Sequence, residues 1–264
     1  MKRLLILGGT KEASQLAIKA ATISNVEVRL SVAGRTTQAR YQVGVTRVGG
    51  FGGVPGLIKY LQDDAIDILI DATHPFAAKI SLHAAVAAKE LDLPRLMLIR
   101  PEWLLQAGDN WLEVDSIINA AKILEENAKR VFLAVGRQQI IHFAYIDNIW
   151  FLMRLIEPPK QDDLIPKGSV ILDRGPFKLI KEKELLIEHQ IDTIVSKNSG
   201  GDATIAKITA ARELGIKVVM VNRPQLPLGE RVNNVEDALR WLLLLKNALW
   251  CSSLFFFSQI LLAR

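Results

Sequence analysis

The stretch Leu4–Ala13 constrains the fold more than any other part of the sequence. A short apolar run, Leu4–Leu7, ends in Gly8, Gly9 and Thr10 and passes directly into residues with helical spacing. This order predicts a buried parallel strand that turns straight into a helix. The N–H groups and the dipole at the start of such a helix suit a phosphate, and glycine lets a ligand approach the backbone closely.

The spacing of this turn is a small-residue variant of the dinucleotide-binding pattern G-x-G-x-x-G. Gly8, Thr10 and Ala13 stand at the three positions that are small in that pattern. Alone, the variant fits an ordinary strand-to-helix turn equally well, so the case for a phosphate site depends on the rest of the chain.

Apolar runs and helical patterns alternate along all 264 residues, which predicts an α/β fold with parallel sheets. Further strands are expected at 26–32, 45–48, 67–71, 95–99, 131–135, 149–155, 170–172, 192–195 and 217–221. Further helices are expected at 54–61, 76–91, 181–189, 205–214 and 235–245.

A weak internal repeat indicates two similar halves. Residues 89–101 align without gaps on 212–224, with Glu, Leu, Met, Arg and Pro in step. A generic helix–strand–Arg–Pro pattern would explain this too, but the matching order of elements favours two α/β halves facing a shared cleft. The turn-rich residues 108–110 suggest domains at 1–108 and 109–246, followed by an apolar tail at 247–264 that packs on the body or on a partner subunit.

Composition narrows the classes of protein. Half of the residues are apolar, and the single cysteine, Cys251, fits a reducing cytoplasm. The net charge of +5 comes without a dense basic block, so a nucleic-acid partner is not favoured, and no His/Cys cluster predicts a metal. The apolar stretch 248–263 is shorter than the ~20 residues of a membrane helix, so membrane contact is a minority alternative.

The end of the second expected strand indicates the kind of nucleotide. Gly34, Arg35 and Thr36 stand where NAD-binding domains usually carry an acidic residue for the ribose 2′-hydroxyl. Arginine and hydroxyl groups suit a 2′-phosphate, which predicts NADP(H) rather than NAD(H); a solvated loop arginine is the alternative. Four of the five residues 49–53 are glycine, which indicates either a flexible loop or a backbone pressed against a ligand.

Polar residues follow the fourth expected strand. Asp71, Thr73 and His74 stand at its carboxyl end, where open α/β sheets bind ligands. Pro75 holds the backbone of His74 extended and can open the next helix. A residue that caps the entry of that helix is the alternative role for His74.

Taken in order, these motifs resemble the precorrin-6A reductases of corrin (vitamin B12) biosynthesis, including the cobalt-precorrin-6A form. The matching stretches are residues 6–13, 33–36, 49–53, 71–77, 100–101, 136–138, 174–177 and 196–201. Asp-Ala-Thr-His-Pro-Phe-Ala at 71–77 and Ser-Lys-Asn-Ser-Gly-Gly at 196–201 are the most specific. The likeness runs from Leu4 to about Leu245 and leaves the tail without a counterpart.

The resemblance implies two Rossmann-like domains and NADPH-dependent reduction of one double bond of a contracted tetrapyrrole to precorrin-6B or its cobalt form, with hydride added at C19 and a proton at C18. The macrocycle carries many carboxylates, which arginine forks and lysines bind well. The expected cofactor-binding residues are Gly8, Gly9, Thr10, Glu12, Gly34, Arg35, Thr36, Gly52 and Thr73. The expected substrate-binding residues are Arg100, Gly136, Arg137, Gln138, Arg174, Lys197, Asn198, Ser199, Gly200 and Arg223. His74 and Asp71 are the expected catalytic residues, as sources of the proton, with water as an alternative donor.

Two other functions stay open at this point: a two-domain transferase for a phosphate-containing ligand such as a nucleotide sugar, and a module that senses NADP(H) without turning it over. Arg35 favours NADP(H) over a nucleotide sugar, and the correlated motifs favour a reductase over a sensor. We expect a monomer or a homodimer.

Overall fold

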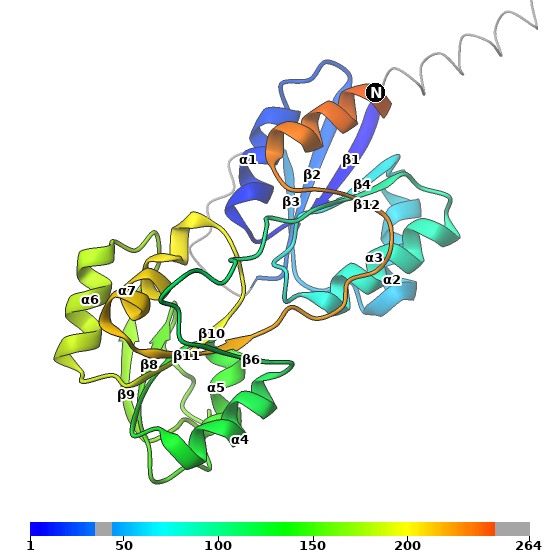
Figure 1. Cartoon of the computed structure of the whole chain (residues 1–264). Coiled ribbons are helices and arrows are strands. Elements are labelled where there is room, and N and C mark those ends of the chain that lie inside the picture. Colours follow the sequence, from blue (N-terminus) through cyan, green and yellow to red (C-terminus); the bar gives the residue numbers. More distant parts are fainter. Residues whose placement is uncertain (35–43, 246–264) are drawn as a thin grey trace, which may run out of the picture. The chain divides into compact units, whose positions relative to one another are not determined.

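The structure, a computed structural model, describes residues 1–34 and 44–245. Arg35, Thr36 and the expected tail at 247–264 therefore lie outside the described residues. The chain divides into two compact units, one made of Met1–Arg100 with Leu226–Arg264 and the other of Pro101–Gln225. Each unit contains a parallel sheet with helices packed on it, which confirms the predicted fold class of two Rossmann-like α/β halves (Figure 1).

The first unit holds a six-stranded parallel sheet in the order β12-β5-β4-β1-β2-β3. Its strands are β1 (Lys2–Leu7), β2 (Val26–Val32), β3 (Val45–Val48), β4 (Ile68–Asp71), β5 (Arg95–Leu98) and β12 (Glu230–Val232). Its helices are α1 (Lys11–Ala20), α2 (Gly53–Asp63), α3 (Ala78–Glu90) and an unlabelled helix over 235–245.

Helices cover both faces of this sheet because successive strand residues point to opposite sides. Leu4 and Ile6 of β1 pack with α1 and with the helix over 235–245 in one buried cluster. Leu5 and Leu7 pack with α2 and α3 in another. The alternate sides of one strand therefore anchor two different helix layers (Figure 1).

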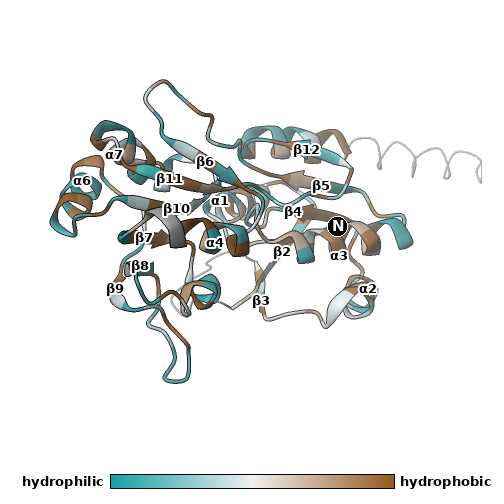
Figure 2. Cartoon of the chain, turned by 60° about the horizontal axis from the view of Figure 1, so that its bottom comes forward, coloured by the Kyte–Doolittle hydropathy of each residue, from teal (hydrophilic) through white to brown (hydrophobic). Residues whose placement is uncertain are grey.

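The second unit holds a parallel sheet in the order β6-β11-β10-β7-β8-β9. Its strands are β6 (Trp111–Val114), β7 (Arg130–Ala134), β8 (Trp150–Leu155), β9 (Gly168–Leu172), β10 (Thr193–Lys197) and β11 (Lys217–Val221). Its helices are α4 (Ile117–Asn127), α5 (Arg137–Ile140), η1 (Ile141–Phe143), α6 (Leu179–Glu188), η2 (Asp202–Thr204) and α7 (Ala206–Leu214). Buried residues of α6 and α7 pack with the strands in one cluster, and α6 carries both hydrophilic and hydrophobic residues along its length, as a half-buried helix should (Figure 2).

The two sheets share one topology. The order of β3, β2, β1, β4 and β5 in the first is repeated by β9, β8, β7, β10 and β11 in the second. The sequence repeat falls on β5 and β11, which are the fifth strands of the two halves. The sixth strand of each sheet does not follow the fifth strand of the same sheet in sequence. β6 is the next strand after β5 along the chain, but it pairs with β11 of the second sheet. β12 is the next strand after β11, but it pairs with β5 of the first sheet.

This exchange explains why the units differ from the expected domains at 1–108 and 109–246. The turn at 108–110 lies inside the second unit, where Asp109 accepts from Arg212 of α7 at 2.8 Å. The chain later returns to the first unit, whose core buries Val235, Ala238 and Leu242. The helix expected at 235–245 is confirmed, whereas β6, α4 and β12 were not expected.

The expectation that Pro75 opens a helix is wrong. The α3 helix begins at Ala78, and Ala77 donates its N–H to the carbonyl of His74 at 2.7 Å. His74 to Ala77 therefore form a turn of their own ahead of the helix.

Replacing Leu242 with alanine is expected to lower the free energy of unfolding by about 2–5 kcal/mol, because a buried side chain is lost and a cavity is left. Leu242 is 0% exposed and Leu244, on the same helix, is 65% exposed. Leu244→Ala is therefore the matched control and should change stability by less than about 0.5 kcal/mol. Chemical denaturation of the whole chain measures both, and equal effects would contradict the packing of this helix in the first unit.

Candidate functional site

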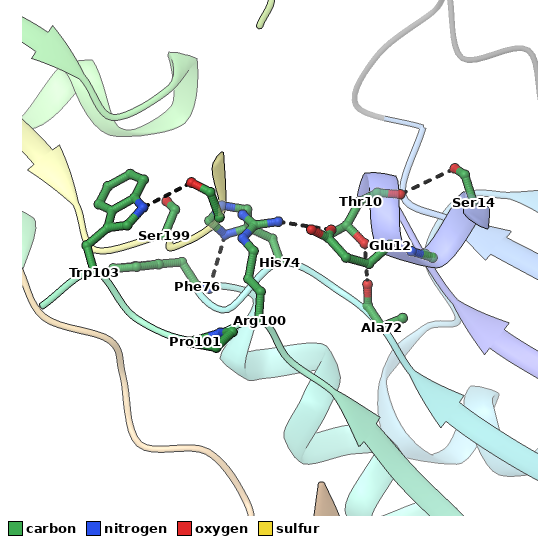
Figure 3. Close-up of polar contacts among 12 residues, drawn as sticks. Thr10, Glu12, Ser14, Ala72, His74, Phe76, Arg100, Pro101, Trp103 and Ser199 are labelled. Atoms are coloured by element: carbon green, nitrogen blue, oxygen red, sulfur yellow. Dashed lines mark hydrogen bonds and ion pairs between the residues drawn. The ribbon is translucent and has the colours of Figure 1, made fainter. Parts of the chain in front are cut away.

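The first unit brings its predicted site residues to the point where the strand order reverses. The chain winds outward from β1 to β2 and β3, and then crosses to β4 on the other side of β1. The loops after β1 and β4 diverge there, which is where open α/β sheets bind ligands. A hydrogen bond of 2.8 Å from Thr10 Oγ1 to the carbonyl oxygen of Ala72 joins the two loops (Figure 3).

The turn after β1 fits a phosphate through its backbone. A Cβ on Gly8 would lie 2.8 Å from Leu30 Cδ1 of β2 and 3.3 Å from Ala13 Cβ of α1, so a larger residue here would press on both the sheet and the helix. Gly9 has a φ of 111°, which glycine adopts readily. Thr10 caps α1, and its Oγ1 accepts from the N–H of Ala13 at 3.1 Å. Since the Thr10 hydroxyl is engaged, an anion here would be held by the backbone N–H groups at the start of the ten-residue helix.

Glu12 and Arg100 form a pair. Arg100 Nη1 lies 3.1 Å from Glu12 Oε2, and both side chains are largely buried (Figure 3). We expected Glu12 in the cofactor site and Arg100 in the substrate site, and the structure joins them at the start of α1. The guanidinium offsets a carboxylate charge that would otherwise repel a phosphate at this turn.

Asp71 organises the loop after β4. Its Oδ1 accepts from the N–H of Thr73 at 3.1 Å and from the Thr73 hydroxyl at 2.7 Å, and the residue is only 4% exposed. His74 follows, and its Nδ1 accepts from the N–H of Phe76 at 3.2 Å (Figure 3). In a neutral imidazole whose Nδ1 accepts, the proton is on Nε2.

Gly34 and Gly52, the other described residues that we expect to bind the cofactor, lie further along the same sheet edge. Gly34 follows β2 with a φ of 67°, and a Cβ there would lie 2.7 Å from Val48 Cγ1. Gly52 precedes α2 after the edge strand β3, two strands away from β1. Sequence reasoning missed Arg47, whose guanidinium binds the carbonyls of the glycine-rich loop beside it. The only sequence signal was an arginine placed just ahead of paired glycines.

The second unit gathers most of its predicted residues at the equivalent point, after β7 and β10. Gly136, Arg137 and Gln138 follow β7, and residues 197–200 end β10 or follow it. Arg137 Nη1 donates to the carbonyl of Pro158 at 3.2 Å. Arg174 is exposed after the edge strand β9, so it lies apart from the other residues along the sheet.

Asn198 and Arg223 bind the protein's own backbone. The Asn198 side chain accepts from the N–H of Trp103 at 2.9 Å and donates to the carbonyl of Trp103 at 3.0 Å. Arg223 donates to the carbonyls of Asn198, Ser199 and Pro101 at 2.9, 3.1 and 3.1 Å. Gly200 is required beside them, because a Cβ there would collide with the carbonyl oxygen of Pro101 and lie 2.6 Å from Arg223 Nη2.

Two features are absent from residues 1–34 and 44–245, the part of the chain that the structure describes. No three His, Cys, Asp or Glu side chains gather there as metal ligands do. No helix within those residues has the length and apolar character needed to span a bilayer.

Comparisons with known proteins agree with this architecture. A family model described as precorrin-6x reductase CbiJ/CobK matches residues 3–243. The precorrin-6A reductase of Rhodococcus erythropolis is 45% identical over 242 residues, which are 91% of this chain and 97% of that protein. The precorrin-6A reductase of a Sinorhizobium species is 45% identical over 237 residues, which are 90% of this chain and 91% of the relative. A solved structure of CobK precorrin-6A reductase has a TM-score of 0.85 and 40% identity, covering 92% of this chain and 96% of that one. Because the likeness spans almost the whole chain in both sequence and fold, the resemblance is confirmed, and this chain belongs to the precorrin-6A reductase family.

Proposed function

We propose that this protein reduces one double bond of precorrin-6A, or of its cobalt form, to the corresponding precorrin-6B with NADPH as the hydride donor. Family membership supports the reductase activity. The main support for the proposed cofactor and site is the hydrogen bond from Thr10 to Ala72, because it sets the proposed phosphate-binding turn beside the loop that contains His74.

In this proposal the pyrophosphate of NADPH binds the N–H groups of Gly9, Thr10 and the start of α1. The 2′-phosphate binds Arg35 and Thr36, which follow β2 in the sequence and lie outside the described residues. The bound cofactor supplies the hydride, and the protein aligns it with the macrocycle. Arg100 keeps the charge of Glu12 neutralised at the phosphate turn.

His74 is the better candidate for the proton donor. To act as an acid its ring must be the imidazolium, which becomes neutral when it gives up a proton, and Nδ1 of the neutral ring then accepts the N–H of Phe76. Asp71 is buried and accepts two hydrogen bonds from Thr73, which is the arrangement of a residue that positions the loop. We therefore assign the acid role to His74 and a positioning role to Asp71.

Substrate carboxylates are assigned to Arg137, Arg174 and Lys197, with hydrogen bonds from Ser199 and Gly200. Asn198 and Arg223 bind backbone groups of residues 101–103, so we assign them the positioning of this loop. The predicted cleft shared by the two units stays a prediction. The transferase and the sensing module lose support, because the family relatives are reductases.

Arg35→Ala is expected to weaken NADPH binding by about tenfold to a hundredfold, because a charge-assisted hydrogen bond contributes about 1.5–3 kcal/mol. NADH lacks the 2′-phosphate, so its affinity should stay within about twofold. Cofactor fluorescence titration measures both. The control is Arg240→Ala, which removes the same charge from a side chain that is 71% exposed. Equal losses for the two nucleotides would remove the 2′-phosphate assignment.

His74→Asn is expected to slow turnover by about 10²–10⁴-fold and to leave NADPH affinity unchanged. The asparagine oxygen can accept the Phe76 N–H in place of Nδ1, so the turn is kept while the transferable proton of the ring is lost. His74→Ala loses both the acceptor for the Phe76 N–H and the proton, so a comparison of the two variants separates the structural role of the turn from proton donation. If His74→Asn turned over like the wild type while His74→Ala lost stability, the residue would have only the capping role.

Asn198→Asp is expected to lower the free energy of unfolding by about 1–3 kcal/mol, because a carboxylate oxygen would replace the N–H donor that faces the carbonyl of Trp103. Asn119→Asp, at an exposed position in the first turn of α4, is the matched control. Chemical denaturation measures the two variants. Wild-type stability together with a loss of substrate affinity alone would mean that Asn198 is a substrate ligand.

A further inference from the structure

The glycine-rich loop after β3 contains one glycine, Gly50, that neither its own φ nor a neighbour among the described residues requires. Gly49, Gly52 and Gly53 have φ values of 118°, 81° and 90°, which strain any other residue. Gly50 has no such φ, and a Cβ added to it would meet no atom of the described residues within 4 Å. Neither the backbone conformation nor the packing of the described residues explains a glycine at this position.

Arg47 holds this loop in place. Its Nη1 donates to the carbonyl of Gly49 at 2.6 Å and its Nη2 to the carbonyl of Gly50 at 2.7 Å. The guanidinium also lies 4.1 Å from the centre of the Phe51 ring. These contacts form a clamp of one arginine on three consecutive residues, which disfavours the flexible loop that the sequence left open.

The other side of the loop is fixed by α2. The rings of Phe51 and Tyr60 meet edge to face with centroids 5.2 Å apart. Burial and the neighbouring Asp64 raise the pKa of Tyr60 to about 12, so the phenol stays neutral beside the arginine. A Cβ on Gly56 would collide with the carbonyl oxygen of Phe51, so the first turn of α2 packs directly on the loop backbone.

The clamped loop stands beside the end of β2. Val32 pairs with Val48, and Gly49 donates its N–H to the carbonyl of Val32 at 2.9 Å. The chain after β2 continues through Gly34 into Arg35, the residue assigned to the 2′-phosphate. In dinucleotide-binding sheets the adenosine ribose lies at this strand end.

We propose that the loop at 49–53 is a wall of the cofactor site against the adenosine half of the dinucleotide, with the missing side chain of Gly50 leaving room for the nucleotide and Arg47 positioning the wall. This inference rests on the proposed use of NADPH. It gives Arg47 and Arg35 different roles. Arg35 distinguishes the two nucleotides by charge, whereas Arg47 and Gly50 act on the adenosine half that NADPH and NADH share.

The test is titration of the full chain with NADPH and with NADH, followed by cofactor fluorescence. Gly50→Ala and Gly50→Val are expected to weaken both nucleotides by the same factor, with a larger loss for valine of about tenfold or more. Their unfolding midpoints should match the wild type, because the first added atom, Cβ, meets no atom of the described residues within 4 Å. Arg47→Ala and Arg47→Lys should also weaken both nucleotides equally and speed amide hydrogen exchange at 49–53, since lysine cannot bridge two carbonyls while stacking on Phe51. Arg240→Ala is the charge control.

Each outcome decides the proposal. If Gly50→Val bound both nucleotides as tightly as the wild type, the loop at 49–53 would not be a wall of the cofactor site. If Arg47→Ala lost affinity for NADPH but not for NADH, Arg47 would be a phosphate ligand instead. If the wild type bound neither nucleotide, the proposed cofactor would fail and the wall with it. If the wall proposal alone is wrong, the wild-type protein still binds NADPH. The two failures are therefore distinguishable.

Discussion

The pairing of β5 with β12, a strand that the chain reaches only after the whole second unit, is the constraint on which the rest of this structure depends. A parallel strand at the edge of a sheet leaves a row of unpaired N–H and C=O groups. β5 is completed by β12, so the six-stranded sheet of the first unit is built from two separate segments of the chain. In the second unit β6 completes β11 within one continuous segment, Pro101–Gln225. The chain must therefore cross between the units twice, after Arg100 and again after Gln225.

Several polar residues of the family motifs make their contacts close to these two crossings of the chain. Arg100 ends the first half and pairs with Glu12 at the start of α1. Arg223, its counterpart in the repeat, donates to the carbonyl of Pro101 just beyond the first crossing. Asn198 then fixes Trp103 through both of its backbone groups. Residues that we expected to bind ligands therefore hold the strand-end loops in position. A site built on loops needs such support if it is to align a hydride donor with a ring carbon.

Local signals predicted much of the fold and part of the site. The strands of both cores are strongly apolar, and the glycine turn, the loop after β4 and the residues after β10 lie where the sequence placed them. β6, α4 and β12 were not expected. β12 is a strand of three residues, Glu230–Val232, two of which are exposed, so it carries little hydrophobic pattern. Its pairing is decided by the open edge of β5, which lies more than a hundred residues earlier in the chain.

The sequence by itself determined the parallel α/β class, the duplication, the family and the strand ends at which the polar residues gather, because apolar periodicity and glycine spacing are local properties of the chain. Only the tertiary structure decided what those polar groups contact. Asn198 and Trp103 are separated by 95 residues, and Arg100 and Glu12 by 88. A hydrogen bond between such residues follows from the order of strands in a sheet, which is set by pairing energies summed over the whole fold and by no short stretch of sequence.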